Sequence, residues 1–335
     1  MTNVNQMWPR VVDIEAGTAV VVTDLHGDWD AYQQYRDCFL QLHHSGQADY
    51  FLLLGDLIHH TGPEEADKSL DIVLDVQALQ KELGDRVICL LGNHEMAHIY
   101  TIPISKGNYF YTPRFEHALG PHRETVIAFF DAMPFYVRSK GGVAFCHAGA
   151  TSMIGQKQAC ERLFTFSHKN VLLETAAALP QAERPYYRKL IAQKYGMSYD
   201  EIVRSHFAVT ADSFHRYDDF LIGITAHENH PDMALLWSAL FNKNEYEYGR
   251  HPYKLYVNAM LQQLSVDYHP QHVLVTGHID VKGGYQQIGR QQLRLASAKH
   301  ANPREAGLYL LVDLEKEIRD SEALIPHLAS VFDDE

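Results

Sequence analysis

An acidic residue and a histidine follow the first strongly apolar run of this sequence. Residues 20–22 are three consecutive valines, a pattern typical of a buried strand, and Asp24, His26, Gly27 and Asp28 come directly after them. Because side chains alternate along an extended chain, this spacing places Asp24 and His26 on the same side. A carboxylate and an imidazole that converge at a strand end make half of a transition-metal site.

The same arrangement recurs at four later apolar runs. These runs end, in chain order, in Gly55-Asp56, in Gly92-Asn93-His94-Glu95, in His147 and in Gly277-His278-Ile279-Asp280. In open α/β sheets the carboxyl ends of the strands form the edge at which ligands bind. Five runs that all end in residues able to bind metal therefore predict a metal centre at such an edge, rather than five unrelated turns.

This ordered set of motifs resembles the calcineurin-like metallophosphoesterases over about residues 20–312. Within that superfamily, residues 129–149 are similar to the phosphoprotein-phosphatase (PPP-like) branch, whose fourth motif reads His-Gly-Gly, although Ala148 stands at the first glycine here. The stretch around Trp237 also resembles a Leu-Trp segment of that branch. The resemblance implies an α/β fold, a four-layer αββα sandwich of two mixed sheets flanked by helices.

The resemblance further implies two divalent metal ions. The ligands that it assigns are Asp24, His26 and Asp56 for one ion, and Asp56, Asn93, His147 and His278 for the other. Asp56 would thus bridge the pair. Carboxylate, imidazole and amide ligands suit Mn or Fe, or Zn, rather than Ca.

Other residues near these motifs receive supporting roles from the resemblance. His94 corresponds to the general acid that protonates the leaving group, and the pKa of a histidine lies near working pH. Glu95 and Asp28 are expected to support the site rather than bind metal. Many members of the wider family carry a further histidine ligand two residues after the last motif histidine, and Asp280 is a candidate ligand in that place.

The second motif departs from the PPP-like pattern Gly-Asp-x-x-Asp-Arg-Gly. His59 replaces the aspartate that would orient the general acid, and His60 replaces the arginine that would hold phosphate. A neutral His59 can accept a hydrogen bond from His94, but the bidentate fork of arginine is lost. The candidates to replace that arginine are Arg114, Arg138 and Arg250.

The composition narrows the class of protein. The chain has 335 residues, is 46% hydrophobic and carries a formal net charge of −13, which disfavours binding to nucleic acid. We expect no signal peptide and no membrane span, and the cysteines do not form a Cys-x-x-Cys pair, so a cytoplasmic protein is predicted. Four histidines in polar stretches are expected at the surface: His43, His44, His168 and His300.

The spacing of apolar residues predicts the elements that position the motifs. Helices over 29–43 and 63–83 alternate with the first three strands, which predicts a parallel βαβαβ unit. Residues 1–335 are interpreted as a single domain, in which 156–264 form a mostly helical insertion that covers the site and sets specificity. The residues up to about Gly17 are expected to be a leader without evident chemistry, and an antiparallel meander that closes the second sheet is expected after His278.

The leading hypothesis is a metal-dependent phosphatase. It would hydrolyse phosphomonoesters, on a protein or a small molecule, by attack of a hydroxide that bridges the two ions, with His94 as general acid. A nucleotide or dinucleoside-polyphosphate hydrolase on the same scaffold is an alternative. A catalytically weak metal-binding scaffold is another, favoured by the loss of the Asp-Arg pair and disfavoured by the complete ligand set.

Overall fold

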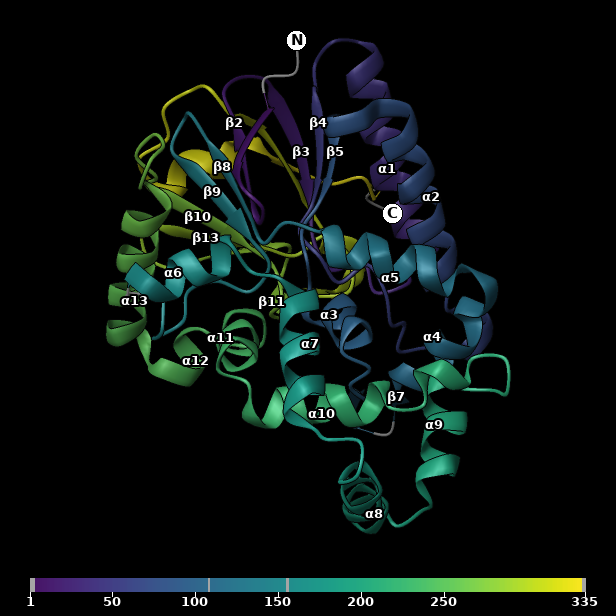
Figure 1. Ribbon diagram of the computed structural model, residues 1–335. Helices are drawn as coiled ribbons and strands as arrows, with labels where there is room; N and C mark the ends of the chain where they lie inside the picture. Colours follow the sequence, from purple (N-terminus) through teal and green to yellow (C-terminus); the bar gives the residue numbers. More distant parts are fainter. Residues whose placement is uncertain (1–3, 108, 155–156, 333–335) are drawn as a thin grey trace.

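Two mixed β-sheets form the centre of the computed structural model, which describes residues 4–107, 109–154 and 157–332 (Figure 1). The first sheet has the order β16-β15-β3-β4-β5. Its strands are β3 (Thr18–Val22), β4 (Tyr50–Leu53), β5 (Val87–Cys89), β15 (Tyr309–Asp313) and β16 (Leu328–Ala329). The second sheet has the order β1-β2-β8-β9-β10-β13-β12. Its strands are β1 (Val4–Trp8), β2 (Val11–Ile14), β8 (Tyr136–Ser139), β9 (Val143–Cys146), β10 (Val273–Thr276), β12 (Tyr285–Gln287) and β13 (Gln292–Leu295).

The predicted βαβαβ unit is confirmed. Strands β3, β4 and β5 are parallel neighbours, and the connections between them run through α1 (Trp29–His44) and α2 (Ser69–Leu83). Asp28 caps α1, because its carboxylate accepts a hydrogen bond from the amide of Ala31 at 3.1 Å. Parallel pairing brings the carboxyl ends of all three strands, and thus the first three motifs, to one edge.

Alternate residues of the strands divide between two cores. One set from both sheets, including Val21, Leu52, Val143 and Val275, packs between the sheets. The residues on the opposite faces, such as Val20 and Phe51, belong to a core that includes residues of α1 and α2, and Phe39 of α1 stacks on Phe51. On the other side of the molecule, helices such as α13 cover the second sheet (Figure 1). This is the four-layer arrangement of helix, sheet, sheet and helix that was predicted.

Two expectations about the chain ends were wrong. The segment before Gly17 is not a featureless leader, because β1 and β2 form the edge of the second sheet there, with β2 parallel to β8. The strands after His278 do not form one continuous meander. The β12–β13 hairpin extends the second sheet with β13 parallel to β10, whereas β15 crosses to the first sheet and pairs antiparallel to β3.

The described residues from Lys157 to Leu264 contain only helices and connections. The helices are α6 (Lys157–Phe164), α7 (His168–Ala178), α8 (Arg184–Tyr195), α9 (Tyr199–Phe207), η4 (Phe214–Arg216), α10 (Asp219–Asn229), α11 (Pro231–Leu240), α12 (Glu245–Tyr248) and α13 (Arg250–Leu264). Residue 156, the first of the predicted insertion, lies outside the described residues. Gly223 of α10 lies against the backbone of Tyr100, where a Cβ atom would overlap the carbonyl oxygen. The helical segment thus packs on the end of α3 (Asn93–Ile99), the helix that carries His94.

Shorter elements complete the chain. They are η1 (Glu64–Ala66), η2 (Gly84–Arg86), β6 (Ser105–Lys106), β7 (Tyr109–Phe110), α4 (Tyr111–Leu119), η3 (Gly120–His122), α5 (Arg123–Ala132), β11 (Val281–Lys282), β14 (Ala301–Asn302), η5 (Arg304–Ala306) and η6 (Ser321–His327). Helix α4 contacts α9 and carries Arg114 and Glu116. Every helix in the described ranges is too short or too polar to cross a bilayer.

Candidate metal centre

The loops after β3, β4 and β10 hold their polar side chains by unusual backbone geometry. Asp24, His26, Asp56 and His278 all have left-handed backbone conformations, with φ of 47°, 47°, 55° and 70°. Residues other than glycine rarely adopt this region, because it crowds the Cβ atom, and each instance costs about 1–3 kcal/mol. The loops also bond to each other, since the amide of His26 donates to the carbonyl of Asp56 at 2.9 Å. The fold thus forces these side chains together.

Three overlapping groups of side chains could each hold a metal ion. They are Asp24, His26 and His300; His26, Asp56 and His94; and Asp56, His147 and His278. Within each group the ligand atoms all lie within 4.8 Å of one another. The amide oxygen of Asn93 joins the third group, because it lies 2.8 Å from Nε2 of His147.

Asp56 lies at the junction of these groups. Its Oδ2 atom is 3.6 Å from Nε2 of His26, 3.5 Å from Nε2 of His147 and 3.9 Å from Nε2 of His94. This places one carboxylate between the two predicted sets of ligands, as the assignment of Asp56 as a bridging residue requires.

The electrostatics of the cluster suit a cation. Burial, together with the carboxylates of Glu95 and Asp24, raises the pKa of Asp56 well above its ordinary value. Burial lowers the pKa of His26 and that of His147, so both imidazoles are neutral, the form that binds metal. Among the described residues, Nε2 of His26 is buried and has no hydrogen-bond partner. A buried polar atom without a partner is costly, and a bound cation would satisfy it.

His300 is a candidate ligand that the sequence interpretation missed, and its expected position at the surface was wrong. The side chain is buried, and its Nδ1 atom lies 3.2 Å from Oδ1 of Asp24. Asp280, the candidate for this position, is 68% exposed at its side chain and approaches only the far side of His300, at 3.7 Å. In the structure, His300 lies beside Asp24, in the place expected for Asp280. It comes 20 residues after Asp280 in the sequence.

We expect His300→Ala to weaken binding of the ion nearest Asp24 by at least about tenfold, since even residues that only orient metal ligands are worth this much. Asp280→Ala should leave metal content unchanged because its carboxylate faces solvent. Counting metal ions per chain after dialysis against a weak chelator would separate the two variants. A larger loss in Asp280→Ala than in His300→Ala would restore the assignment made from the motif alone.

Glu95 braces the loops of the cluster. Its carboxylate accepts hydrogen bonds from the amides of Asp56, Leu57 and Gly92, at 3.0, 2.8 and 3.1 Å. Burial raises the pKa of Glu95 to about 7, against the opposing effect of these hydrogen bonds. The side chain therefore supports the Asp56 loop and the start of α3.

His59 and His94 lie in contact, as the substitution in the second motif suggested. Their Nδ1 atoms are 2.8 Å apart, and the ring of His59 stacks on Tyr111 with centroids 5.1 Å apart. Burial lowers the pKa of His59 well below its ordinary value. A neutral imidazole at this position has one ring nitrogen free to accept a hydrogen bond.

Other predicted site residues lie outside the groups of candidate ligands. His60 is half-buried, and its Nδ1 atom accepts a hydrogen bond from the amide of Gly62 at 2.9 Å. Arg114 donates to the carbonyl oxygens of His60 and Gly62, at 3.2 and 3.0 Å, and pairs with Asp67 at 3.5 Å. Arg114 therefore fixes this loop.

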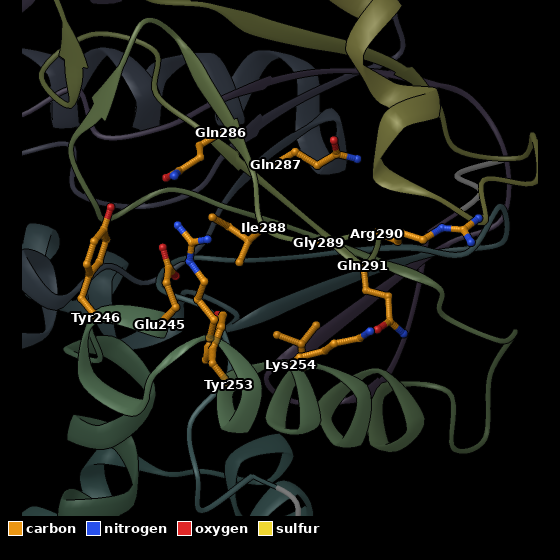
Figure 2. A pocket seen from close by; sticks show the side chains of 12 residues that line it. Glu245, Tyr246, Tyr253, Lys254, Gln286, Gln287, Ile288, Gly289, Arg290 and Gln291 are labelled. Atoms are coloured by element: carbon orange, nitrogen blue, oxygen red, sulfur yellow. The ribbon is translucent and has the colours of Figure 1, made fainter.

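The remaining arginine candidates are also engaged or distant. Arg138 is fully buried and forms a bidentate pair with Asp13, at 2.6 and 2.8 Å. Arg250 lines a cavity of about 490 Å³ between α13 and the β12–β13 hairpin, whose lining in the described chain includes none of the candidate ligands. Figure 2 shows this cavity, with Tyr253 and Lys254 on one side and Gln286 and Gln287 on the other. None of the three arginines is thus placed with the cluster.

A lysine from the segment that brings in His300 also lies beside the cluster. The amide of Lys299 donates to the carbonyl of Asp24 at 3.2 Å, and its ammonium group contacts the hydroxyl of Thr61. Burial is the main cause that lowers the pKa of His60, and the charges of Lys299 and Arg114 act in the same direction. Asp28 pairs with Arg304 at 2.6 Å, consistent with a supporting position outside the metal groups.

The other three histidines expected at the surface differ in their exposure. His44 is exposed, and His43 is half-buried against the carbonyl of Ala48, at 2.9 Å. The expectation for His168 was wrong, because it is fully buried with its Nδ1 atom 3.0 Å from the hydroxyl of Tyr100. The rings of Tyr100 and Phe135, far away in sequence, pack against His168 together with that of Phe166, two residues before it.

Comparisons with known proteins found a family profile and solved structures that this chain resembles. Residues 17–282 match the profile of the calcineurin-like phosphoesterase family. No curated protein matches the chain by sequence. A protein serine/threonine phosphatase from Saccharomyces cerevisiae, described as similar to human phosphatase PP5, shares the fold with a TM-score of 0.51 at 12% identity, over 92% of this chain and 77% of that one. A cold-active protein tyrosine phosphatase aligns with a TM-score of 0.48 at 13% identity, over 91% and 76% of the two chains.

Proposed function

The chain belongs to the calcineurin-like phosphoesterase family, and from that premise we propose that it is a metal-dependent phosphatase that hydrolyses phosphomonoesters. The observation that carries this proposal is the position of Asp56, whose Oδ2 atom lies 3.6 Å from His26 and 3.5 Å from His147. One carboxylate shared between two sets of neutral imidazoles is the arrangement that two-metal hydrolysis needs. Bound there, two ions would polarise the phosphate and acidify a water molecule.

Each of the remaining roles is assigned to a residue of this chain. Asp24, His26, Asp56 and His300 would hold one ion, and Asp56, Asn93, His147 and His278 the other. His94 would deliver a proton to the departing oxygen, because its Nε2 atom faces the cluster, 3.9 Å from Oδ2 of Asp56. Most of these side chains are buried, so the charges in the site are weakly screened.

Purified protein loaded with Mn²⁺ should hydrolyse p-nitrophenyl phosphate, and chelation should abolish the reaction. Restoring Mn²⁺ after chelation should restore the rate, which distinguishes metal removal from unfolding. The same assay with an alkyl phosphate, a phosphopeptide and a dinucleoside polyphosphate defines the substrate class. Turnover of the last compound alone would favour the nucleotide hydrolase, and metal-replete protein with no turnover on any of the four would favour a metal-binding scaffold.

A further inference from the structure

A chain of buried hydrogen bonds leads away from His94 into the protein. His59 lies between two histidines of α3, with Nδ1 2.8 Å from Nδ1 of His94 and Nε2 2.8 Å from Nε2 of His98. Nδ1 of His98 in turn lies 2.8 Å from Oε1 of Glu116, on α4. His94 and His98 are four residues apart on one helix, so they share a face, and the ring of His59 fits between them.

We propose that Glu116 positions His94 for proton delivery through His98 and His59. The proposal rests on the proposed function, because it takes His94 as the general acid. In the PPP-like pattern a single aspartate orients this histidine. Here a carboxylate two imidazoles further away would do the same work, and His59 would transmit its effect rather than simply replace that aspartate.

The direction of the hydrogen bonds supports this assignment. When His94 carries protons on both ring nitrogens, its Nδ1–H must find an acceptor on His59. His59 then keeps its proton on Nε2 and donates to Nε2 of His98, and His98 donates from Nδ1 to Glu116. Every donor is satisfied only in this order, and an ionised carboxylate, which can only accept, fixes the order from the far end.

Glu116 is held in its ionised form. The carboxylate is buried, and its Oε2 atom lies 2.9 Å from Nε of Arg123 and 3.3 Å from Nη2 of Arg216. Burial alone would raise the pKa of Glu116, but the hydrogen bond from His98 and the hydrogen bond and charge of Arg123 lower it below its ordinary value. Charge-assisted bonds of this kind are stronger than neutral ones, which makes Glu116 a firm anchor for the chain.

Protein atoms enclose the middle of the chain. His59, His98 and Glu116 are each about 1% exposed or less. Phe115 packs edge-on against His98, with ring centroids 4.8 Å apart, and Tyr111 stacks on His59. Such rings leave few alternative partners for the imidazole nitrogens, so a change at Glu116 should be felt at His94.

The carboxylate end of this chain of hydrogen bonds also contacts the helical segment between Lys157 and Leu264. Arg216 lies in η4, and Asp219, at the start of α10, pairs with its Nε atom at 3.6 Å. Arg123 comes instead from α5. The segment predicted to confer specificity therefore contributes a residue that fixes the anchor of His94.

The test compares two leaving groups in Glu116→Gln, with Glu124→Gln, an exposed glutamate on the neighbouring helix, as the matched control. General acid catalysis contributes about 10²–10⁴-fold and matters most for a poor leaving group. Glu116→Gln should lower kcat on an alkyl phosphate by at least about tenfold. It should change kcat on p-nitrophenyl phosphate, whose leaving group needs little protonation, by less than about threefold. Metal content should stay unchanged. Equal losses on both substrates would indicate a merely structural role and overturn the proposal, as would no loss on either.

A second measurement does not depend on turnover. In wild-type protein labelled with nitrogen-15 at histidine, we expect His98 to carry its proton on Nδ1 and His59 on Nε2. The variants His98→Gln and His59→Gln assign the signals. A His59 protonated on Nδ1 would reverse the chain and overturn the proposal, even if no substrate is found. Absence of wild-type turnover together with the expected tautomers would count against the proposed function alone.

Discussion

Asp56→Asn should remove both metal ions and lower kcat/KM on p-nitrophenyl phosphate by at least about 10³-fold, because the ions supply several kcal/mol of charge stabilisation and each 1.4 kcal/mol is tenfold. Its Oδ2 atom lies within 3.6 Å of His26 and of His147, so the carboxylate touches both sets of ligands. Asparagine keeps the shape but loses the charge that balances two dications. Counting metal ions per chain, alongside activity, measures the effect.

Asp24→Asn provides the comparison. Asp24 joins only the group that contains His26 and His300, and its carboxylate also accepts a hydrogen bond from the amide of His278 at 2.9 Å. We expect this variant to lose one ion preferentially and to retain part of the other. If the two variants lost metal equally and only partly, Asp56 would not be a bridging ligand.

His94→Asn should lower kcat on an alkyl phosphate by about 10²–10⁴-fold with little change on p-nitrophenyl phosphate, as removal of a general acid requires. Its Nε2 atom faces Asp56 across 3.9 Å, whereas its Nδ1 atom is taken by His59. The Nε2 atom is thus available for proton transfer, whereas the Nδ1 atom forms the hydrogen bond with His59. Initial rates on the two substrates, measured at saturating Mn²⁺, give the ratio.

His94 also stands in one of the candidate metal groups, so metal content decides between two roles. A general acid can be replaced without loss of metal, and a ligand cannot. His117→Asn, an exposed histidine on α4, is the control for the substitution itself. Loss of metal from His94→Asn, with equal losses of rate on both substrates, would assign His94 as a ligand instead.

Local sequence predicted the part of the site that lies at strand ends. The valines before Asp24 and the apolar run before Asp56 predict parallel strands, and β3 and β4 are parallel neighbours that bring both residues to one edge. Period-two alternation and the position of polar residues after a run are properties of a few neighbouring residues, so they can be read without the rest of the fold.

His300 could not be found in this way. It reaches Asp24 because β13 pairs with β10 and the chain then returns across the cluster, with the amide of Lys299 bonded to the carbonyl of Asp24. This is a contact between residues far apart in sequence, and the polar stretch around His300 resembles a surface loop. Pairing partners of this kind depend on the tertiary fold rather than on local pattern.

The histidine chain lies between these cases. The spacing of His94 and His98 places them on one helical face, a signal that the sequence contains. The third imidazole comes from the loop after β4 and the carboxylate from α4, and only the packing of α4 against that loop brings them together. The departure from the family pattern at His59 showed that the support of His94 differs here. The carboxylate at the end of the chain, Glu116, lies 57 residues downstream and could not be identified from local sequence.

The left-handed backbone at Asp24, His26, Asp56 and His278 has a consequence for how this protein can change. Glycine would relax the main chain at each position, whereas the side chains present there are the ones that the site needs. Activity and stability therefore favour different residues at these four positions. Under selection for thermal stability in the absence of metal, replacement of these four residues would therefore stabilise the protein. Such a protein would keep the fold and lose the metal site.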